Sequence, residues 1–400
     1  MIAGFFYDER FTRDAAGTYY SSTGSLPYAV FERYLKHFDR IVVVGRYAEQ
    51  RERRTVASGA GVEFACIDAS RLGRTRLITA VARHVRETLA RVDCAIIRLP
   101  GLLGPLACRE AIRSRTPWMA EVVGNAFDSL WNYGSWKGKV AAVPMQLLNR
   151  HAIRRARFAI YVTQQFLQRT YPPSGMWAGV SDVLIDAPEA DTLRRRIARI
   201  EAGSARAAAV LGLIGSYDVN YKGHETALRA LAQLARSGRA VTLRCIGVGD
   251  AGRWRARAAA LGVHRFVEFG GALPQGRRVL DWMDGLDVYL APSLQEGLPR
   301  ALVEAMSRAL PAIGSLRGGI PELLERRWLH RAGDHRALAG LAAALLDDRE
   351  EMKAQALRNW RVASEYAPDV LDARREGLVE QFKEAAIANA RGQAARAFAQ

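Results

Sequence analysis

Lysine, cysteine and long apolar runs are scarce in this sequence of 400 residues. It contains six lysines and four cysteines. No stretch approaches the roughly 18 uninterrupted apolar residues that a membrane-spanning helix needs. The cysteines share no metal-ligand spacing, and three of them lie within or beside apolar runs. The sequence therefore excludes a disulfide-stapled or membrane-spanning protein and favours reduced core cysteines in the cytoplasm.

Acidic residues are also in deficit, because 58 Lys and Arg stand against 41 Asp and Glu and the net charge is +17. Such an excess suits phosphates, nucleic acid or an anionic membrane as a partner. Since arginine and alanine are abundant throughout, a compositional bias of the coding sequence explains the charge as well, and both interpretations stay open. The start, 1–7, has no positively charged segment, so it predicts a first strand and not a signal peptide.

Short apolar runs alternate with amphipathic stretches along the whole chain, which predicts parallel sheets covered by helices. In the first half the expected strands are 2–7, 40–44, 61–66, 94–99, 118–123 and 158–162, and the helices include 81–89 and 102–112. In the second half the expected strands are 208–214, 240–246, 266–269, 288–291 and 312–315, and the helices include 224–236, 278–285 and 302–309. A helical series is expected from 336 to about 389, and the small, polar residues 390–400 are expected to fray.

A polar segment, 186–203, separates the two halves and predicts a domain boundary near residue 200. Each half then forms a doubly wound α/β domain. Because ligands of such folds bind at the carboxyl ends of the strands, the chemistry is expected there.

Gly247, Gly249 and Gly252 follow an expected strand as a literal G-x-G-x-x-G, and Glu268 comes about sixteen residues later. Glycines in this pattern let a backbone approach a pyrophosphate at a helix N-terminus. The motif favours an NAD-dependent nucleotide-sugar dehydrogenase or epimerase as an alternative function. Against it, the motif follows the second strand of its half, whereas a nucleotide-binding half opens with such a motif.

A second motif joins the strand expected at 288–291 to the next helix. Pro299 is expected at the first helical position, where its missing N–H costs nothing, so the amides of Gly297 and Leu298 face the strand tip. Glu296 in the turn and Glu304 in the helix can then line one elongated ligand. An anion bound by the helix end and hydroxyls bound by carboxylates describe a sugar nucleotide, although two glutamates at this spacing also occur by chance.

A third feature is the lone Lys222, which precedes Gly223 at the start of a helix. It follows Gly215 and Ser216, which end the first strand of the second half, so Lys222 lies at the same sheet edge. There it can neutralise a diphosphate leaving group, and a solvated surface lysine is the ordinary alternative. No D-x-D sequence occurs. We therefore expect Lys222 and helix dipoles, without an essential metal ion, to bind the diphosphate.

Together these segments resemble the nucleotide-sugar glycosyltransferases of the GT-B fold, specifically glycosyltransferase family 4, the retaining enzymes of polysaccharide and glycolipid assembly. The resemblance covers most of residues 205–325. It is carried by Gly215 with Lys222-Gly223, the turn 247–250, Phe269-Gly270-Gly271, residues 287–293, the E-x(7)-E pair Glu296 and Glu304, and Gly318-Gly319-Ile320-Pro321-Glu322-Leu323.

The resemblance implies an α/β protein of the GT-B fold, with two Rossmann-like doubly wound domains facing a central cleft. Residues 1–190 would form the acceptor-side domain and residues 191–365 the nucleotide-sugar-binding domain. Residues 366–400 would form a helix crossing back to the first domain, followed by a frayed tail.

The resemblance also implies the roles of the site residues. Glu296 contacts the transferred sugar, Glu304 binds the ribose, and Lys222 binds the diphosphate. Ser216 stands where the family usually has an arginine, so diphosphate binding must depend on Lys222, the helix N-terminus or another arginine. The implied donor-binding set is Gly215, Ser216, Gly247, Gly271, Ser293, Gly297, Leu298, Pro299 and Glu304, beside the catalytic Glu296 and Lys222.

The implied reaction transfers a sugar, with retention and without a metal or other cofactor, from a UDP- or GDP-sugar to a hydroxyl of a glycan or lipid-linked acceptor. The acceptor attacks the anomeric carbon from the face that the diphosphate leaves, and Glu296 orients the sugar. The expected setting is bacterial-type surface polysaccharide or glycolipid assembly in the cytoplasm.

The first half resembles the family less closely. The stretch 17–25, which starts at Gly17, suits a first strand-to-helix loop that meets the donor phosphates or the acceptor, or a plain surface loop. Arg98 ends an apolar strand and is expected to point into the cleft. The family often carries a site histidine in this half, but His37, His84 and His151 lie in helix-like stretches and none matches.

Two stretches bear on partners other than the donor. Leu148, Ala152, Ile153, Ala156 and Ile160 fall on one helical face and cations on the other, which is typical of a helix on an anionic membrane or of a helix packed on its own sheet. Upstream, Trp131, Tyr133 and Trp136 alternate with Lys137 and Lys139. Peripheral association with the inner face of a membrane stays open. The aromatics form no RNA-binding motif, so no nucleic-acid partner is expected.

Overall fold

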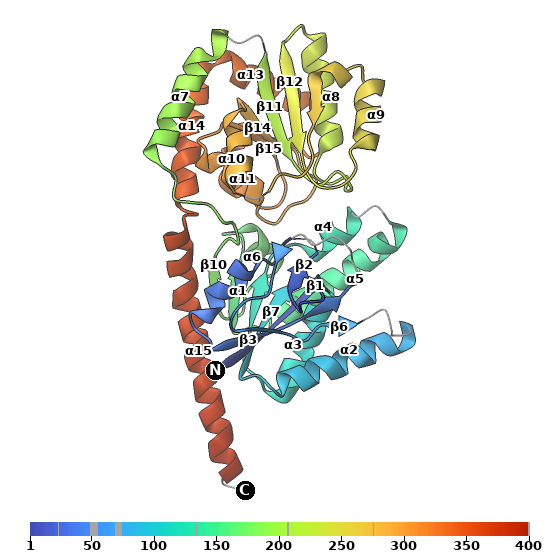
Figure 1. Ribbon diagram of the computed structural model, residues 1–400, viewed down its shortest axis with the longest axis vertical. Helices are drawn as coiled ribbons and strands as arrows, with labels where there is room; N and C mark the ends of the chain where they lie inside the picture. The colour runs from blue at the N-terminus through green and yellow to red at the C-terminus, as the bar shows by residue number, and fades with distance from the viewer. Residues whose placement is uncertain are drawn as a thin grey trace. The chain divides into compact units, whose positions relative to one another are not determined.

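In the computed structural model the chain forms two α/β units (Figure 1). The structure describes residues 1–22, 24–48, 55–68, 74–132, 135–205, 208–274 and 276–398. The first unit consists of residues 1–126, 143–182 and 372–400, and the second of residues 127–142 and 183–371. The chain thus changes units at 126/127, 142/143, 182/183 and 371/372, whereas the sequence suggests boundaries at 190/191 and 365/366 only.

The sheet of the first unit is built around β1 (Ile2–Arg13), which pairs in parallel with β3 (Arg40–Tyr47) and β7 (Cys94–Leu99). The remaining parallel strands are β8 (Trp118–Val122), β9 (Phe158–Tyr161) and β10 (Met176–Gly179) beyond β7, and β5 (Val62–Phe64) and β6 (Ile67–Asp68) beside β3. Strands β7, β8 and β9 are buried along their whole length. Their continuous apolar runs are what a parallel sheet covered on both faces requires.

β1 continues beyond the expected end at residue 7, into an antiparallel arm with β2 (Tyr19–Ser21) and β4 (Thr55–Val56). The buried Glu9 carboxylate permits this, because it accepts hydrogen bonds from the hydroxyls of Ser21 (2.8 Å) and Ser25 (3.0 Å). Gly17 lies in the turn between β1 and β2, with φ +88°. The expectation that 17–25 forms a strand-to-helix loop is therefore wrong for residues 17–21.

The helices assigned wholly or partly to this unit share the usual role of covering the sheet. They are α1 (Tyr28–Leu35), α2 (Arg74–Leu89), α3 (Leu103–Ser114), α4 (Ala126–Trp131), α5 (Trp136–Ile153), α6 (Phe166–Thr170) and α15 (Pro368–Phe398). From Asp372 onward, α15 packs on the first unit: Asp372 accepts a hydrogen bond from Lys36 (2.7 Å), and the Phe382 ring contacts that of Phe38. The expected fraying of residues 390–400 is wrong as far as Phe398, because alanine, arginine and glutamine there favour a helix.

The second unit has a parallel six-stranded sheet. Its order is β13 (Val267–Phe269), β12 (Val241–Ile246), β11 (Ala209–Ile214), β14 (Val288–Ala291), β15 (Ala312–Ser315) and β16 (Leu329–His330). Strand order reverses between β11 and β14, so the loops that follow these two strands diverge there. This switch point is where open α/β sheets bind ligands.

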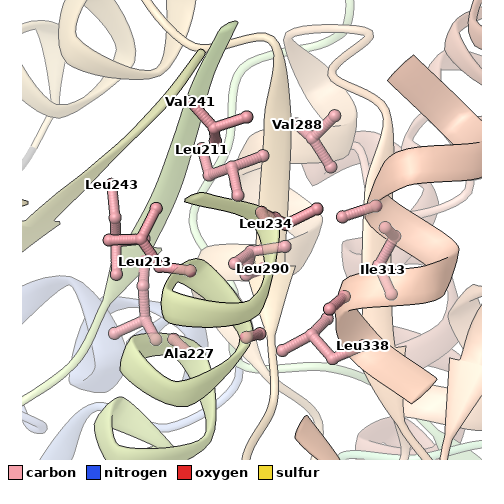
Figure 2. Close-up of a cluster of buried hydrophobic side chains, with 14 of the residues drawn as sticks. Leu211, Leu213, Ala227, Leu234, Val241, Leu243, Val288, Leu290, Ile313 and Leu338 are labelled. Atoms are coloured by element: carbon pink, nitrogen blue, oxygen red, sulfur yellow. The ribbon is translucent and has the colours of Figure 1, made fainter. Parts of the chain in front are cut away.

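The helices of the second unit cover this sheet. They are α7 (Ala190–Glu201), α8 (His224–Arg236), α9 (Gly252–Ala260), α10 (Arg277–Asp284), α11 (Arg300–Ser307), α12 (Ile320–Leu323), α13 (His335–Asp347) and α14 (Arg349–Ser364), with 3-10 turns at Ala202–Ala205, His264–Phe266 and Arg326–Trp328. Figure 2 shows the core, in which Leu213 and Leu290 of the sheet meet Ala227 and Leu234 of α8 and Leu338 of α13. Each buried leucine contributes about 1.5–3 kcal/mol, so this core sets the positions of the strand ends.

The expected amphipathic helix from Leu148 to Ile160 is not formed. α5 ends at Ile153, a turn follows in which the Ala156 N–H donates to Ile153 O (3.0 Å), and Ile160 is a buried residue of β9. The apolar spacing continued by coincidence across a helix end, a turn and a strand. In the described part of the chain no helix is both long and apolar enough to span a bilayer.

All four cysteines are free thiols. Cys94, Cys108 and Cys245 are buried and Cys66 is half-buried. Burial raises the pKa of the Cys66 and Cys94 thiols to about 12, so both stay protonated and unreactive at neutral pH. Cys94, Cys108 and Cys245 are core residues, as the sequence predicts, whereas Cys66 is only partly buried.

Candidate active site

The loops at the carboxyl ends of β11, β12 and β14 are joined by hydrogen bonds. The Gly215 N–H donates to Ile246 O (3.0 Å), which ties the end of β11 to the end of β12. The Leu294 N–H donates to Tyr221 O (2.7 Å), which ties the loop after β14 to the loop before α8. These loops therefore form one continuous rim at the switch point of the sheet.

Lys222 and Glu296 meet at the centre of this rim. The Lys222 Nζ donates to Glu296 Oε1 at 2.7 Å, and the Ser293 Oγ donates to the same oxygen at 2.8 Å. Ser293 is in turn held by Ser315, whose Oγ donates to Ser293 O (2.6 Å). The two charged side chains are only 27% and 11% exposed, so their attraction is screened less than that of a surface ion pair. The structure thus brings together three residues that the sequence predicts for one site.

Two glycines allow the neighbouring loops to approach this pair. Gly223 has φ +82°, and a Cβ atom there would overlap Pro292 O. Gly318 has φ +57°, and a Cβ atom there would overlap Glu296 O. Only glycine combines this backbone conformation with such close contact. Gly223 and Gly318 are therefore required for packing the loop that carries Glu296.

Glu304, on α11, is the second carboxylate of the pair. Burial raises its pKa, while the nearby Arg300 lowers it. Among the residues that the structure describes, no hydrogen-bond donor or ion-pair partner reaches its carboxylate. It lines a cavity of about 460 Å³ within the second unit. The other lining residues are Leu184, Ile185, Asp186, Ala187, Pro188, Glu189, Arg195, Gly276, Arg277, Val279, Leu280, Ser307, Arg308 and Pro368.

Tyr289 on β14 is a buried residue whose phenol is affected by the charges of both glutamates, and sequence reasoning missed it. Its side chain is buried, and burial is the main cause that raises the pKa of its phenol. The negative charges of Glu304 and Glu296 raise it further. A tyrosine inside an apolar strand just before the E-x(7)-E motif was the available signal.

The start of α11 completes the rim. The helix begins at Arg300, two residues before the start of the helix expected at 302–309, and Pro299 is its N-cap instead of its first helical residue. The Gly297 carbonyl accepts a hydrogen bond from the Gly319 N–H (2.6 Å), whereas the N–H groups of Gly297 and Leu298 have no acceptor within the described ranges. Donors at a helix start attract anions.

The G-x-G-x-x-G motif has another explanation in the structure. A Cβ atom at Gly247 would overlap Gly215 O, so this glycine lets β12 end against the β11 loop. Asp218 accepts a hydrogen bond from the Asp250 N–H (3.2 Å), and Asp250 accepts one from the Gly252 N–H (2.9 Å). Two carboxylates therefore occupy the start of α9, where a pyrophosphate would be repelled. The arrangement disfavours the nicotinamide alternative.

His224, the first residue of α8, is a second group that sequence reasoning missed. It is 1% exposed, its ring stacks on Trp254 with centroids 5.1 Å apart, and neither ring nitrogen has a hydrogen-bond partner in the described structure. Burial, followed by the charges of Arg253 and Lys222, lowers its pKa to about 4. A neutral histidine thus supports the loop that carries Lys222. No sequence pattern marks His224 as a residue of the site.

The remaining predicted donor residues contribute through the backbone or a short side chain. The Gly271 carbonyl accepts a hydrogen bond from the Gly247 N–H (3.4 Å). The Ser216 Oγ accepts one from the Asp218 N–H (3.3 Å) and supplies no positive charge. Arg253, a nearby guanidinium, donates to Asn220 (2.8 Å) and to Tyr217 O, so it braces the same loop.

In the first unit, the expectation that Arg98 points into a cleft is wrong. Arg98 is 3% exposed, and its guanidinium donates to Asp182 (2.7 Å) and Glu121 (3.3 Å) and lies over the Tyr7 ring. The strand end places it inside the unit, where it neutralises two carboxylates. Gly17 lies in a hairpin turn, and Tyr133 lies outside the described residues.

Comparison with known proteins identifies the family. Residues 208–348 match the sequence model of the family described as "Glycosyl transferases group 1". A 2-deoxystreptamine glucosyltransferase of Streptomyces kanamyceticus is 30% identical over 325 residues, which cover 70% of this chain and 83% of that protein. The chain is a group 1 glycosyltransferase.

Other relatives agree with this assignment. Protein CapJ of Staphylococcus aureus is 28% identical over 359 residues, which cover 88% of this glycosyltransferase and 89% of CapJ. WcaL of Escherichia coli K12, a putative colanic acid biosynthesis glycosyltransferase, is 37% identical over 136 residues, which cover 31% of this chain and 32% of WcaL.

Solved structures establish the fold of this glycosyltransferase. A sucrose-phosphate synthase from Thermosynechococcus elongatus has a TM-score of 0.71 at 16% identity, covering 96% of this chain and 100% of that one. Anabaena HepE, in complex with UDP and glucose, has a TM-score of 0.65 at 17% identity, covering 95% and 100%. The GT-B fold that the sequence implies is confirmed.

Proposed function

We propose that this glycosyltransferase moves a sugar from a UDP- or GDP-sugar to a hydroxyl of a glycan or lipid-linked acceptor. The observation that carries the proposal is the half-buried pair of Lys222 and Glu296 beside the amides of Gly297 and Leu298, which donate to no acceptor in the described part of the chain. HepE, which has a similar fold, was solved with UDP-glucose. Relatives are named for colanic acid and amylovoran biosynthesis, which supports a role in surface polysaccharide or glycolipid assembly.

In this proposal the donor diphosphate replaces Glu296 as the ion-pair partner of Lys222. Its oxygens accept hydrogen bonds from the Lys222 ammonium and from the amides of Gly297 and Leu298, so the ammonium exchanges one anionic partner for another. Glu296 then loses its ion pair with Lys222, keeps its hydrogen bond from Ser293, and becomes available to the sugar. Glu304 binds the ribose hydroxyls, because its carboxylate is desolvated and accepts no hydrogen bond from the residues that the structure describes.

We further propose a retaining reaction. The acceptor oxygen forms its bond to the anomeric carbon on the face from which the diphosphate departs, the bond to the phosphate oxygen breaks with its electron pair, and that oxygen receives the acceptor proton. Glu296 stabilises the positive charge that develops on the sugar. Lys222 and the start of α11 neutralise the leaving group, which makes a metal ion unnecessary. The proposed location is the cytoplasm, at the inner face of a membrane when the acceptor is lipid-linked.

The first test is a thermal-shift screen of the purified protein against UDP-, GDP- and other nucleoside-diphosphate sugars. We expect one class of donor to raise the melting temperature, and Lys222→Met to abolish that shift. Lys36→Met is the matched control, because Lys36 also forms a 2.7 Å ion pair, with Asp372, in the first unit. A donor shift that survives Lys222→Met, or that NAD produces instead, would contradict the proposal.

The second test concerns stereochemistry and metal. With the donor identified, NMR of the product from an α-linked donor sugar should show an α linkage, and turnover should persist in excess EDTA. A β-linked product would refute retention. Loss of turnover in EDTA that Mg²⁺ or Mn²⁺ restores would refute the metal-independent mechanism.

A further inference from the structure

Helix α5 presents an apolar stripe to solvent. Trp136, Val140, Val143 and Leu147 follow one another at intervals of four, three and four residues, which places them on one helical face. Their exposed fractions are 72%, 69%, 53% and 60%. Most amphipathic helices turn such a face toward the core, and this one turns it outward.

The buried face of the same helix explains the orientation. Gly138, Ala142, Asn149 and Ala152 are buried, and they lie roughly opposite the stripe around the helix axis. The helix is therefore already packed through its small residues. The stripe is additional apolar surface that no described part of the chain covers.

The charge around the stripe has one sign. Residues 129–181 contain no aspartate or glutamate, but they contain seven lysines and arginines. Lys139 and Arg150 are exposed and border the stripe along one side. The Lys139 ammonium lies 5.6 Å from the Trp131 ring centroid, and the Lys137 ammonium lies 5.9 Å from that of Trp136. Apolar, aromatic and cationic groups thus share one surface.

We propose that this α5 surface, defined by Trp136, Val140, Val143 and Leu147 with Lys139 and Arg150, docks on an anionic lipid membrane. Apolar side chains enter the acyl boundary, tryptophan lies at the headgroup level, and the cations pair with lipid phosphates. A second copy of the chain is a poorer occupant, because a symmetric contact would place like charges together. The inference extends the proposed location at a membrane, but it rests on α5 alone and not on the donor chemistry.

Vesicle sedimentation tests the proposal. We expect the wild type to bind vesicles of phosphatidylcholine and phosphatidylglycerol in equal amounts and to stay in solution with phosphatidylcholine alone. V140Q/L147Q should weaken binding on the order of tenfold, since each substitution removes a partly inserted apolar side chain. The control I78Q/L102Q changes two aliphatic side chains of matching exposure, 63% and 62%, and should bind like the wild type.

Charge and depth are tested separately. K139Q/R150Q should weaken vesicle binding by roughly tenfold or more, because each cation contributes about fivefold. The control R236Q/R265Q removes two other exposed cations and should leave vesicle binding unchanged. Lipids with brominated acyl chains should quench the tryptophan fluorescence of the wild type more than that of Trp136→Phe. All variants should keep wild-type turnover on a water-soluble acceptor, so failure here is distinguishable from failure of the proposed reaction.

The proposal is overturned if the wild type ignores anionic vesicles, or if V140Q/L147Q and I78Q/L102Q bind them equally. It is also overturned if light scattering shows a dimer that V140Q/L147Q dissociates while vesicle binding is absent, because the stripe is then an interface between copies.

Discussion

Replacing Lys222 by methionine separates the structural and chemical roles of the Lys222–Glu296 pair. Methionine keeps an unbranched side chain and removes the charge, which leaves a carboxylate that is 11% exposed with Ser293 as its remaining described donor. Loss of a partner costs about 0.2–1 kcal/mol at an exposed pair and about 3–5 kcal/mol at a buried one. For this half-buried pair we expect the free energy of unfolding to fall by about 1–2 kcal/mol, a decrease of roughly 2–8 °C in Tm.

The effect on catalysis should be larger. If Lys222 neutralises the departing diphosphate, Lys222→Met removes a charge that acts mainly in the transition state, and kcat should fall about a hundredfold to a thousandfold. The double variant K222M/E296Q no longer contains an uncompensated carboxylate. We therefore expect it to recover stability relative to Lys222→Met without recovering turnover.

Thermal unfolding and initial transfer rates, measured on the same preparations, decide the question. Lys36→Met should be as active as the wild type. The reasoning is refuted if the kcat of Lys222→Met is within about threefold of the wild-type value, since removing a charge that neutralises the departing diphosphate should lower kcat much more. Equal stability of Lys222→Met and K222M/E296Q would show that Glu296 is not an uncompensated charge.

Three further predictions concern the surroundings of the pair. The pKa of His224 is about 4, below the usual 6.5, so on acidification the unfolded chain binds the proton before the folded chain does. The free energy of unfolding of the wild type therefore decreases as the pH is lowered below 6.5. His224→Phe should remove up to ~1.4 kcal/mol of this loss per pH unit. Glu304→Gln should be at least as stable as the wild type, because burial raises the pKa of Glu304 and its charge is costly. Its donor KM should nevertheless rise roughly tenfold or more through loss of a charged acceptor. Gly318→Ala should cost about 1–3 kcal/mol, because φ is +57° and the methyl group would overlap Glu296 O.

Each of these predictions has its own check. For His224→Phe, parallel curves of Tm against pH for variant and wild type would exclude the titration. An unchanged donor KM in Glu304→Gln would exclude the ribose contact. Gly340→Ala, at an open position in α13, is the control for Gly318→Ala and should gain up to about 1 kcal/mol by helix propensity. Equal melting of the two glycine variants would show that the Glu296 loop tolerates displacement.

Local pattern was sufficient wherever a segment has one environment along its length. Strands 94–99, 288–291 and 312–315 and helix 224–236 lie where the sequence predicts them, to the residue. Each is an apolar or strongly amphipathic run with polar residues, glycine or proline at or close to its ends, and such runs cannot leave the core without exposing several side chains.

Local pattern failed where a distant group decides the outcome. The strand from Ile2 continues past Asp8 and Glu9 because Ser21 and Ser25 satisfy the buried Glu9. Arg98 turns inward because Glu121 and Asp182 are there to neutralise it. The apolar spacing from Leu148 to Ile160 does not indicate that the helix ends at Ile153. The outcomes at Glu9 and Arg98 depend on partners at least 12 residues away in the chain.

The sequence by itself determined the family, the α/β fold, and the presence of Lys222 and Glu296 in loops after strands with Glu304 in the helix that follows, because spacing and propensity are properties of neighbouring residues. Only the tertiary structure decided that Lys222 bonds to Glu296 across 74 positions, that Glu304 instead lines a cavity, and that the charges of both carboxylates raise the pKa of the buried Tyr289 phenol. It also decided that the apolar residues of α5 face solvent. Distance, burial and the uncovered face of a helix arise from long-range packing, which no local pattern encodes.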